Sequence, residues 1–186
     1  YGKCVLKIIP PFIGRYEQEC SCYRSLNASF MCELLDFDDS CSALLMEYCY
    51  EADEPDKETV VSFFDKVLHG AVNKYSDMEA SGFHNYSDIL HHKLNENSFD
   101  YEHEKIMLYV NKAVKLYDDT FKEQDSVLIH GDLHSYNIMS KNNQLVAIDP
   151  IGYIAPIEID IARFIGTELT DGNGDISRNY KLLLEQ

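Results

Sequence analysis

Two hydrophobic periods along the chain predict a mixture of strands and helices. Short apolar runs at residues 3–9, 30–37, 43–48, 127–129 and 145–148 are typical of β-strands. Helices are expected over residues 14–25, 60–71, 87–94 and 106–117, most clearly where apolar residues recur with a 3.6-residue period. In the helix over 60–71 these positions are Val60, Val61, Phe64, Val67, Leu68 and Ala71. The charged, proline-bearing segment 51–58 separates the strand-rich start from a more helical remainder, so the pattern predicts an α+β fold divided near residue 50.

One stretch, residues 127–150, carries the clearest candidate chemistry. A short apolar strand leads into a polar turn with His130, Asp132, His134 and Asn137, and a second apolar strand ends at Asp149. Loop residues at strand ends, held by a rigid scaffold, commonly carry function. An aspartate followed five residues later by an asparagine has the spacing of a kinase catalytic loop, where the aspartate accepts the hydroxyl proton and the asparagine binds magnesium. Asp149 then supplies a second hard oxygen ligand of the kind that magnesium prefers.

The motif HGDLHSYN, followed by AIDPIGY, resembles the aminoglycoside phosphotransferase family, which has a protein-kinase-like fold. With the later EIDIARF, it is most similar to the branch of streptomycin phosphotransferases and their hydroxyurea-resistance relatives. The resemblance implies transfer of the γ-phosphate of ATP to a hydroxyl of a small molecule such as an aminoglycoside. It makes Asp132 the catalytic residue and Asn137 and Asp149 the Mg²⁺ ligands. His130 and Asp160 are expected to stabilise the loop rather than to react.

The same resemblance assigns a nucleotide site to the first 50 residues. Lys7, which interrupts an apolar strand, would contact the phosphates and pair with a glutamate of the next helix; the E-x-x-x-L spacing favours Glu19 over Glu17. Backbone groups near Glu47 and Cys49 would receive the adenine. The resemblance implies a partial N-terminal lobe over 1–50 and a C-terminal lobe over 51–186. The glycine-rich loop expected before Lys7 is absent from the sequence, and the chain is expected to be a fragment with weak activity alone.

Several alternatives compete with this interpretation. Asp132, Asn137 and Asp149 could be ordinary turn residues. His130, Asp132 and His134 alternate, so on an extended strand they could share a face and bind a metal, although no histidine follows them to complete such a site. Kinases of choline, fructosamine or homoserine type would share the same residues. A non-catalytic nucleotide-binding protein is disfavoured because the Asp, Asn and Asp trio is intact.

Composition and charge limit the classes of molecule that the protein is expected to bind. The 186 residues carry 32 acidic and 16 basic side chains, for a net charge of −16, so nucleic acid and anionic membranes are unlikely partners and a cationic acceptor is weakly favoured. No long apolar run or signal peptide is evident, which predicts a cytoplasmic protein without a membrane span. The sequence leaves the oligomeric state open.

Cysteine and histidine spacing gives little support for a metal centre. Free thiols are favoured over a disulfide or metal role, because the six cysteines show no C-x-x-C pair and the chain is not a small secreted domain. These cysteines are Cys4, Cys20, Cys22, Cys32, Cys41 and Cys49. The irregular spacing of His84, His91, His92 and His103 predicts surface positions.

Overall fold

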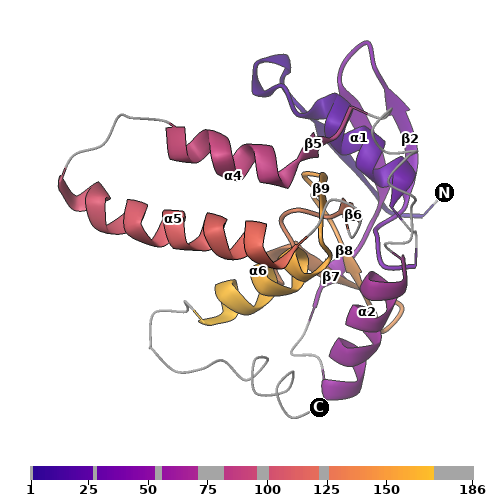
Figure 1. Cartoon of the computed structure of the whole chain (residues 1–186). Coiled ribbons are helices and arrows are strands. Elements are labelled where there is room, and N and C mark those ends of the chain that lie inside the picture. Colours follow the sequence, from indigo (N-terminus) through magenta and orange to yellow (C-terminus); the bar gives the residue numbers. More distant parts are fainter. Residues whose placement is uncertain are drawn as a thin grey trace.

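A computed structural model describes residues 2–26, 29–52, 56–70, 82–95, 101–121 and 126–169 (Figure 1). Three small sheets and surrounding helices confirm the predicted α+β class. The strands are β1 (Cys4–Ile8), β2 (Leu34–Asp38), β3 (Ala43–Glu47), β4 (Tyr50–Glu51), β5 (His84–Asn85), β6 (Val127–Ile129), β7 (Ile138–Lys141), β8 (Gln144–Ala147) and β9 (Tyr153–Ala155). The helices are α1 (Tyr16–Ser25), α2 (Lys57–Gly70), α4 (Tyr86–Asn95), α5 (Tyr101–Thr120) and α6 (Glu158–Leu169), with 3-10 turns η1 (Pro11–Ile13) and η4 (Ser135–Asn137).

The first sheet has the order β1-β3-β2 and is antiparallel throughout. Lys7 of β1 lies opposite Leu44 of β3, whose side chain is fully buried. Helix α1 lies beside this sheet (Figure 1) and buries Tyr23 and Leu26 at its end. The sheet and α1 therefore hold Lys7 and the helix glutamates on neighbouring elements.

Two further three-stranded sheets, β4-β7-β8 and β5-β9-β6, support the motif region. β7 and β8 form a hairpin whose loop residues, Asn142 and Asn143, both have positive φ, at 50° and 60°. Two such residues in a row are typical of the two-residue turn that joins hairpin strands. The sequence pattern predicted β6 and β8 from their apolar runs but did not predict β7, whose last two residues, Ser140 and Lys141, are polar, or β9.

The predicted strand over 30–37 is only partly correct. β2 begins at Leu34, while Phe30, Met31 and Cys32 instead run beside Ala147 at the end of β8. The Cys32 amide donates to the Ala147 carbonyl at 2.9 Å, and the Ala147 amide donates to the Phe30 carbonyl. Phe30 and Met31 are each 2% exposed. These hydrogen bonds join the segment before β2 to the sheet that carries the motif. They pair the buried backbone groups of residues 30–32 with Ala147, so these residues do not continue β2.

Helices α1, α2, α4 and α5 were predicted, with two errors in the buried face of α2. Its core positions are Val60, Phe63, Phe64 and Val67, which follow the i, i+3, i+4, i+7 pattern of one face. Phe63 was missed, and Leu68 is 43% exposed because it lies about 100° further round the helix from Val67. Ala71 lies outside the described residues.

α4 and α5 form a pair that projects from the rest of the chain (Figure 1). These two helices were expected near residues 87–94 and 106–117, and both extend somewhat beyond the predicted bounds. Among the described residues, none of the helices combines the length and the apolar character needed to cross a membrane.

Candidate functional site

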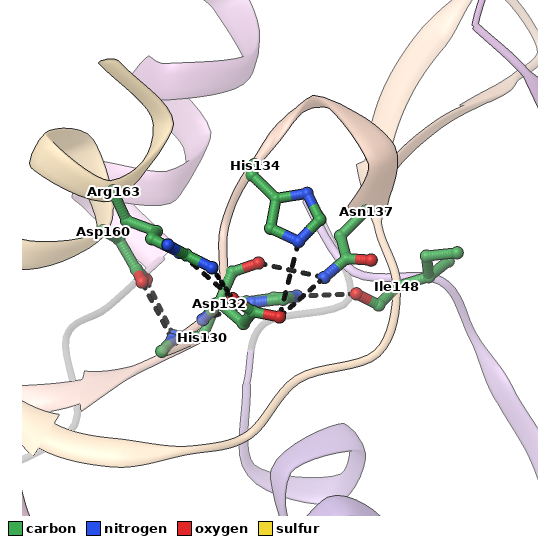
Figure 2. Close-up of polar contacts among 8 residues, drawn as sticks. His130, Asp132, His134, Asn137, Ile148, Asp160 and Arg163 are labelled. Carbon is green, nitrogen blue, oxygen red and sulfur yellow. Dashed lines mark hydrogen bonds and ion pairs between the residues drawn. The ribbon is translucent and has the colours of Figure 1, made fainter. Parts of the chain in front are cut away.

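The motif loop is anchored by a buried carboxylate at the start of α6. Asp160, 1% exposed, accepts hydrogen bonds from the backbone amides of His130 at 2.7 Å and Gly131 at 2.8 Å (Figure 2). Burial raises the pKa of Asp160 to about 7, although the two backbone hydrogen bonds act in the opposite direction. The geometry agrees with the structural role that the sequence suggested for Asp160, because its oxygens face the backbone rather than open space.

His130 also serves the loop's architecture. Its ring is 1% exposed; Nε2 lies 2.8 Å from the Ile148 carbonyl, and Nδ1 accepts the Asp132 amide at 3.3 Å. A carbonyl can only accept and an amide can only donate, so the ring is neutral with its proton on Nε2. Burial lowers the pKa of His130 to about 4, which keeps it neutral near pH 7. Both nitrogens are therefore occupied, and His130 does not join Asp132 and His134 in the alternative metal site.

Asp132 is surrounded by hydrogen-bond donors. Arg163 of α6 approaches Oδ1 with Nε at 3.1 Å and with Nη2 at 2.8 Å (Figure 2). On the other side, Oδ2 lies 3.3 Å from Asn137 Nδ2 and 3.4 Å from His134 Nε2. Asn137 Nδ2 also donates to the Asp132 carbonyl at 3.0 Å, which closes the five-residue loop between them. The carboxylate is thus held in one orientation, with Asn137 beside it.

Asp149 meets two of the four predicted nucleotide residues, Lys7 and Glu19, in one cluster of ion pairs. Lys7 Nζ lies 2.7 Å from Glu19 Oε1 and 3.0 Å from Asp149 Oδ1, so one ammonium bridges two carboxylates. Burial alone would lower the pKa of Lys7, but the hydrogen bonds and charges of Glu19 and Asp149 hold it above its ordinary value. Of the two glutamates considered, it is therefore Glu19 that pairs with Lys7. Asp149 has a φ of 58°, and its amide donates to the Tyr23 hydroxyl at 2.9 Å, which fixes the turn after β8.

A polar cleft of about 170 Å³ gathers these groups. It is lined by Lys7, Arg15, Gln18, Glu19, Asp132, Asn137, Asp149, Pro150 and Ile151. Five of the seven predicted site residues therefore share one cavity, although they come from β1, α1 and the loop on either side of the β7–β8 hairpin.

The remaining two predicted residues, Glu47 and Cys49, do not line this cleft. They lie where β3 leads into β4. The Glu47 amide donates to the Glu33 carbonyl at 3.0 Å, and the Glu47 carbonyl accepts the Cys32 thiol at 3.5 Å. The Glu47 side chain is ion-paired with Lys141 of β7.

Three residues of the site were not predicted from the sequence. Arg163 lies 31 residues after Asp132 and carries no local signal beyond its place in EIDIARF. Arg15 precedes α1 and lines the cleft, and Gln18 donates to the Gly152 carbonyl at 2.8 Å, tying α1 to the loop that carries Asp149. Their roles depend on which way α1 and α6 face, which a single sequence does not reveal.

The predicted surface histidines show no metal cluster within the described part of the chain. His91 faces Asp118 across the α4–α5 pair at 3.2 Å, and His84 is exposed on β5. The side chain of His103 lies outside the described residues. All six cysteines are free thiols, as predicted.

Comparison with known proteins identifies the fold. No protein-family model and no curated protein matches the chain. A choline/ethanolamine kinase family protein from Mesorhizobium loti matches with a TM-score of 0.63 and 12% identity, over 99% of this chain and 63% of that one. Choline kinase LicA from Streptococcus pneumoniae gives 0.62 and 16%, over 92% and 64% of the two chains.

This chain adopts the protein-kinase-like fold. A thermostable mutant of an aminoglycoside phosphotransferase, in complex with ADP and hygromycin B, also matches, with a TM-score of 0.52 and 14% identity over 81% of this chain and 60% of that one. The predicted fold is thus confirmed, and its neighbours are small-molecule phosphotransferases. The chain spans less than two thirds of the length of each of these three structures. The narrower resemblance to streptomycin phosphotransferases and the division near residue 50 stay predictions.

Proposed function

We propose that the chain is the core of an ATP-dependent phosphotransferase that moves the γ-phosphate to a hydroxyl of a small molecule. The observation that carries this proposal is the cleft shared by Lys7, Glu19, Asp132, Asn137 and Asp149. Phosphoryl transfer depends mainly on positioning and charge stabilisation, which require a fixed cation, hard oxygen ligands and an oriented base. The cleft offers all three within one polar cavity.

The oxygen donors of Asn137 and Asp149 fit a magnesium ion. Asn137 directs its Nδ2 toward Asp132, which leaves its amide oxygen as the group to face a cation, and Asp149 reaches the cleft on the turn after β8. When bound, Mg²⁺-ATP supplies the phosphoryl group and the cation that offsets its charge. Lys7, oriented by Glu19, would contact the phosphates. Arg15 places a second positive charge on the same cleft, where it would also contact the phosphates.

Asp132 would orient the acceptor hydroxyl and take up its proton. Arg163 holds Oδ1 through two donors, so the carboxylate cannot rotate without breaking both contacts. The adenine would lie against the backbone of Glu47 and Cys49. The Glu47 amide already donates a hydrogen bond to the Glu33 carbonyl. The Glu47 carbonyl accepts the Cys32 thiol but has a second lone pair, so it can still accept a hydrogen bond.

A cationic alcohol is the acceptor class that the chain's charge favours. The net charge of −16 attracts polycations and repels anions, an effect that salt weakens. Aminoglycosides such as streptomycin carry several positive charges and many hydroxyls, and the sequence motif resembles their kinases. Choline, which carries one quaternary ammonium and one hydroxyl, is the second candidate because a choline/ethanolamine kinase family protein and choline kinase LicA match this fold with TM-scores of 0.63 and 0.62.

The test is ATP consumption in the presence of Mg²⁺ with a panel of acceptors. The panel includes streptomycin, other aminoglycosides, hydroxyurea, choline, a fructosamine and homoserine. Asp132→Asn is the inactive variant, and Asp65→Asn on the exposed face of α2 is the matched control. We expect consumption that depends on one acceptor, is retained by Asp65→Asn and is lost in Asp132→Asn. Nucleotide binding without turnover for any acceptor would contradict the enzymatic proposal, and turnover by Asp132→Asn equal to that of the wild type would contradict the role of Asp132.

A further inference from the structure

Two buried thiols and a carboxylate meet at the junction of β3 and β4, away from the polar cleft. Cys32 is 3% exposed and Cys49 is 7% exposed. The ligand atoms of Cys32, Glu47 and Cys49 all lie within 4.8 Å of one another. The Cys32 thiol donates a hydrogen bond to the Glu47 carbonyl at 3.5 Å. Among the described residues, this is the group of cysteine, histidine and acidic side chains whose ligand atoms lie close enough together to hold a metal ion.

The backbone fixes the three residues independently of any ligand. The Cys32 amide donates a hydrogen bond to the Ala147 carbonyl, and the Glu47 amide donates one to the Glu33 carbonyl. Glu47 also ends β3, the central strand of its sheet, and Cys49 directly precedes β4, which pairs with β7. A ligand set built on such rigid segments needs little reorganisation to bind a cation.

Distance and charge both suit a divalent, sulfur-preferring cation. Zinc–sulfur bonds of about 2.3 Å in a tetrahedron place two sulfurs about 3.8 Å apart. The observed spacing needs only small side-chain movements to reach this geometry. Two thiolates, one carboxylate and a divalent cation sum to a charge of −1, and Lys141, which is ion-paired with Glu47, offsets it. The soft sulfur ligands favour zinc over magnesium.

We propose that Cys32, Glu47 and Cys49 bind one Zn²⁺ ion, with a water molecule as the fourth ligand. Binding converts both thiols to thiolates and releases two protons, and the Glu47 carboxylate provides one oxygen to the metal. Sequence spacing does not suggest this site, because Cys32 lies 15 residues before Glu47, on a separate segment. The zinc ligands are side chains, whereas the proposed phosphotransferase would use only the backbone of Glu47 and Cys49, so zinc binding is measured in the absence of nucleotide.

The experiment titrates the reduced, metal-free chain with Zn²⁺ in competition with a chromophoric chelator, and repeats the titration with Co²⁺. The test variants are Cys32→Ser, Cys49→Ser, the double serine variant and Glu47→Gln. Two controls remove thiols outside the site: Cys20→Ser changes a buried thiol on α1, and Cys4→Ser with Cys41→Ser removes both exposed thiols. Circular dichroism establishes that each variant is folded.

We expect one Zn²⁺ per chain and a thiolate-to-cobalt charge-transfer band with Co²⁺. Each single serine variant should bind Zn²⁺ at least about tenfold more weakly, and the double variant should lose the cobalt band. Glu47→Gln should also weaken binding. Because it leaves both buried thiols in place, it tests the site even where a serine variant fails to fold. Both controls should bind as the wild type does. Zinc affinity that is unchanged in the double variant or lost in the exposed-thiol control, or a chain that binds no zinc, would overturn the proposal.

Discussion

Replacing Gly152 by alanine tests the packing that positions Asp149. Gly152 has a φ of 81°, and a Cβ at this position would lie 2.1 Å from Cys22 Sγ on α1 and 3.1 Å from a Phe83 ring carbon. A side chain in the left-handed region costs roughly 1–2 kcal/mol. Overpacking against the fully buried Cys22 thiol costs a further ~1–3 kcal/mol. Gly152→Ala should therefore lower the free energy of unfolding by about 2–5 kcal/mol.

Urea denaturation followed by circular dichroism measures this change. Gly166→Ala is the control, because Gly166 lies in α6 with ordinary φ and open space around its Cβ position, so alanine there should stabilise by about 0.5–1 kcal/mol. Adding Cys22→Ala to Gly152→Ala should recover the steric part of the loss but not the backbone part, giving a favourable coupling energy. A Gly152→Ala variant as stable as the wild type would refute the described contact between α1 and the loop.

Other predictions concern the cleft and its anchor. Arg163→Met removes both donors to Asp132 Oδ1, so the acceptor-dependent kcat should fall about ten- to a hundredfold while ATP affinity stays unchanged; equal losses in both would contradict a positioning role. Lys7→Met should weaken ATP binding at least about tenfold in calorimetric titration, whereas Lys66→Met on α2 should not, because only Lys7 lines the cleft. Between the usual carboxyl pKa and about 7, folded Asp160 keeps a proton that the unfolded chain releases, so its contribution to stability falls as pH rises. The unfolding free energy of Asp160→Asn relative to the wild type should therefore increase by up to ~1.4 kcal/mol per pH unit from pH 5 to 7, and a flat difference would argue against the raised pKa.

The local part of the site could be predicted from the sequence because it lies within one short segment. Asp132, Asn137 and Asp149 are separated by 5 and 12 residues, and their spacing alone suggested a shared site. Lys7 and Glu19 were found only through the resemblance, because a lysine within an apolar strand is more often a surface residue. Helices such as α2 showed a clear period, whereas the short strands β7 and β9 did not.

What the sequence could not provide depends on contacts between distant segments. Arg163 reaches Asp132 because the buried Asp160, in the first turn of α6, binds the motif loop and holds the helix beside it. The pairing of residues 30–32 with Ala147 is a long-range backbone contact with no side-chain signature. The Cys32 and Cys49 thiols likewise meet through this pairing, not through any motif.

The most direct test of the central claim is the affinity of ATP in the presence and absence of Mg²⁺, measured by calorimetry for the wild type, Asp149→Asn and the control Asp65→Asn. The claim is that Lys7, Asn137 and Asp149 form one site for a magnesium-bound nucleotide. We predict that Mg²⁺ strengthens ATP binding by the wild type and by Asp65→Asn. In the presence of Mg²⁺, Asp149→Asn should bind ATP at least about tenfold more weakly than the wild type. ATP binding of equal strength with and without Mg²⁺, or unchanged by Asp149→Asn, would contradict the account.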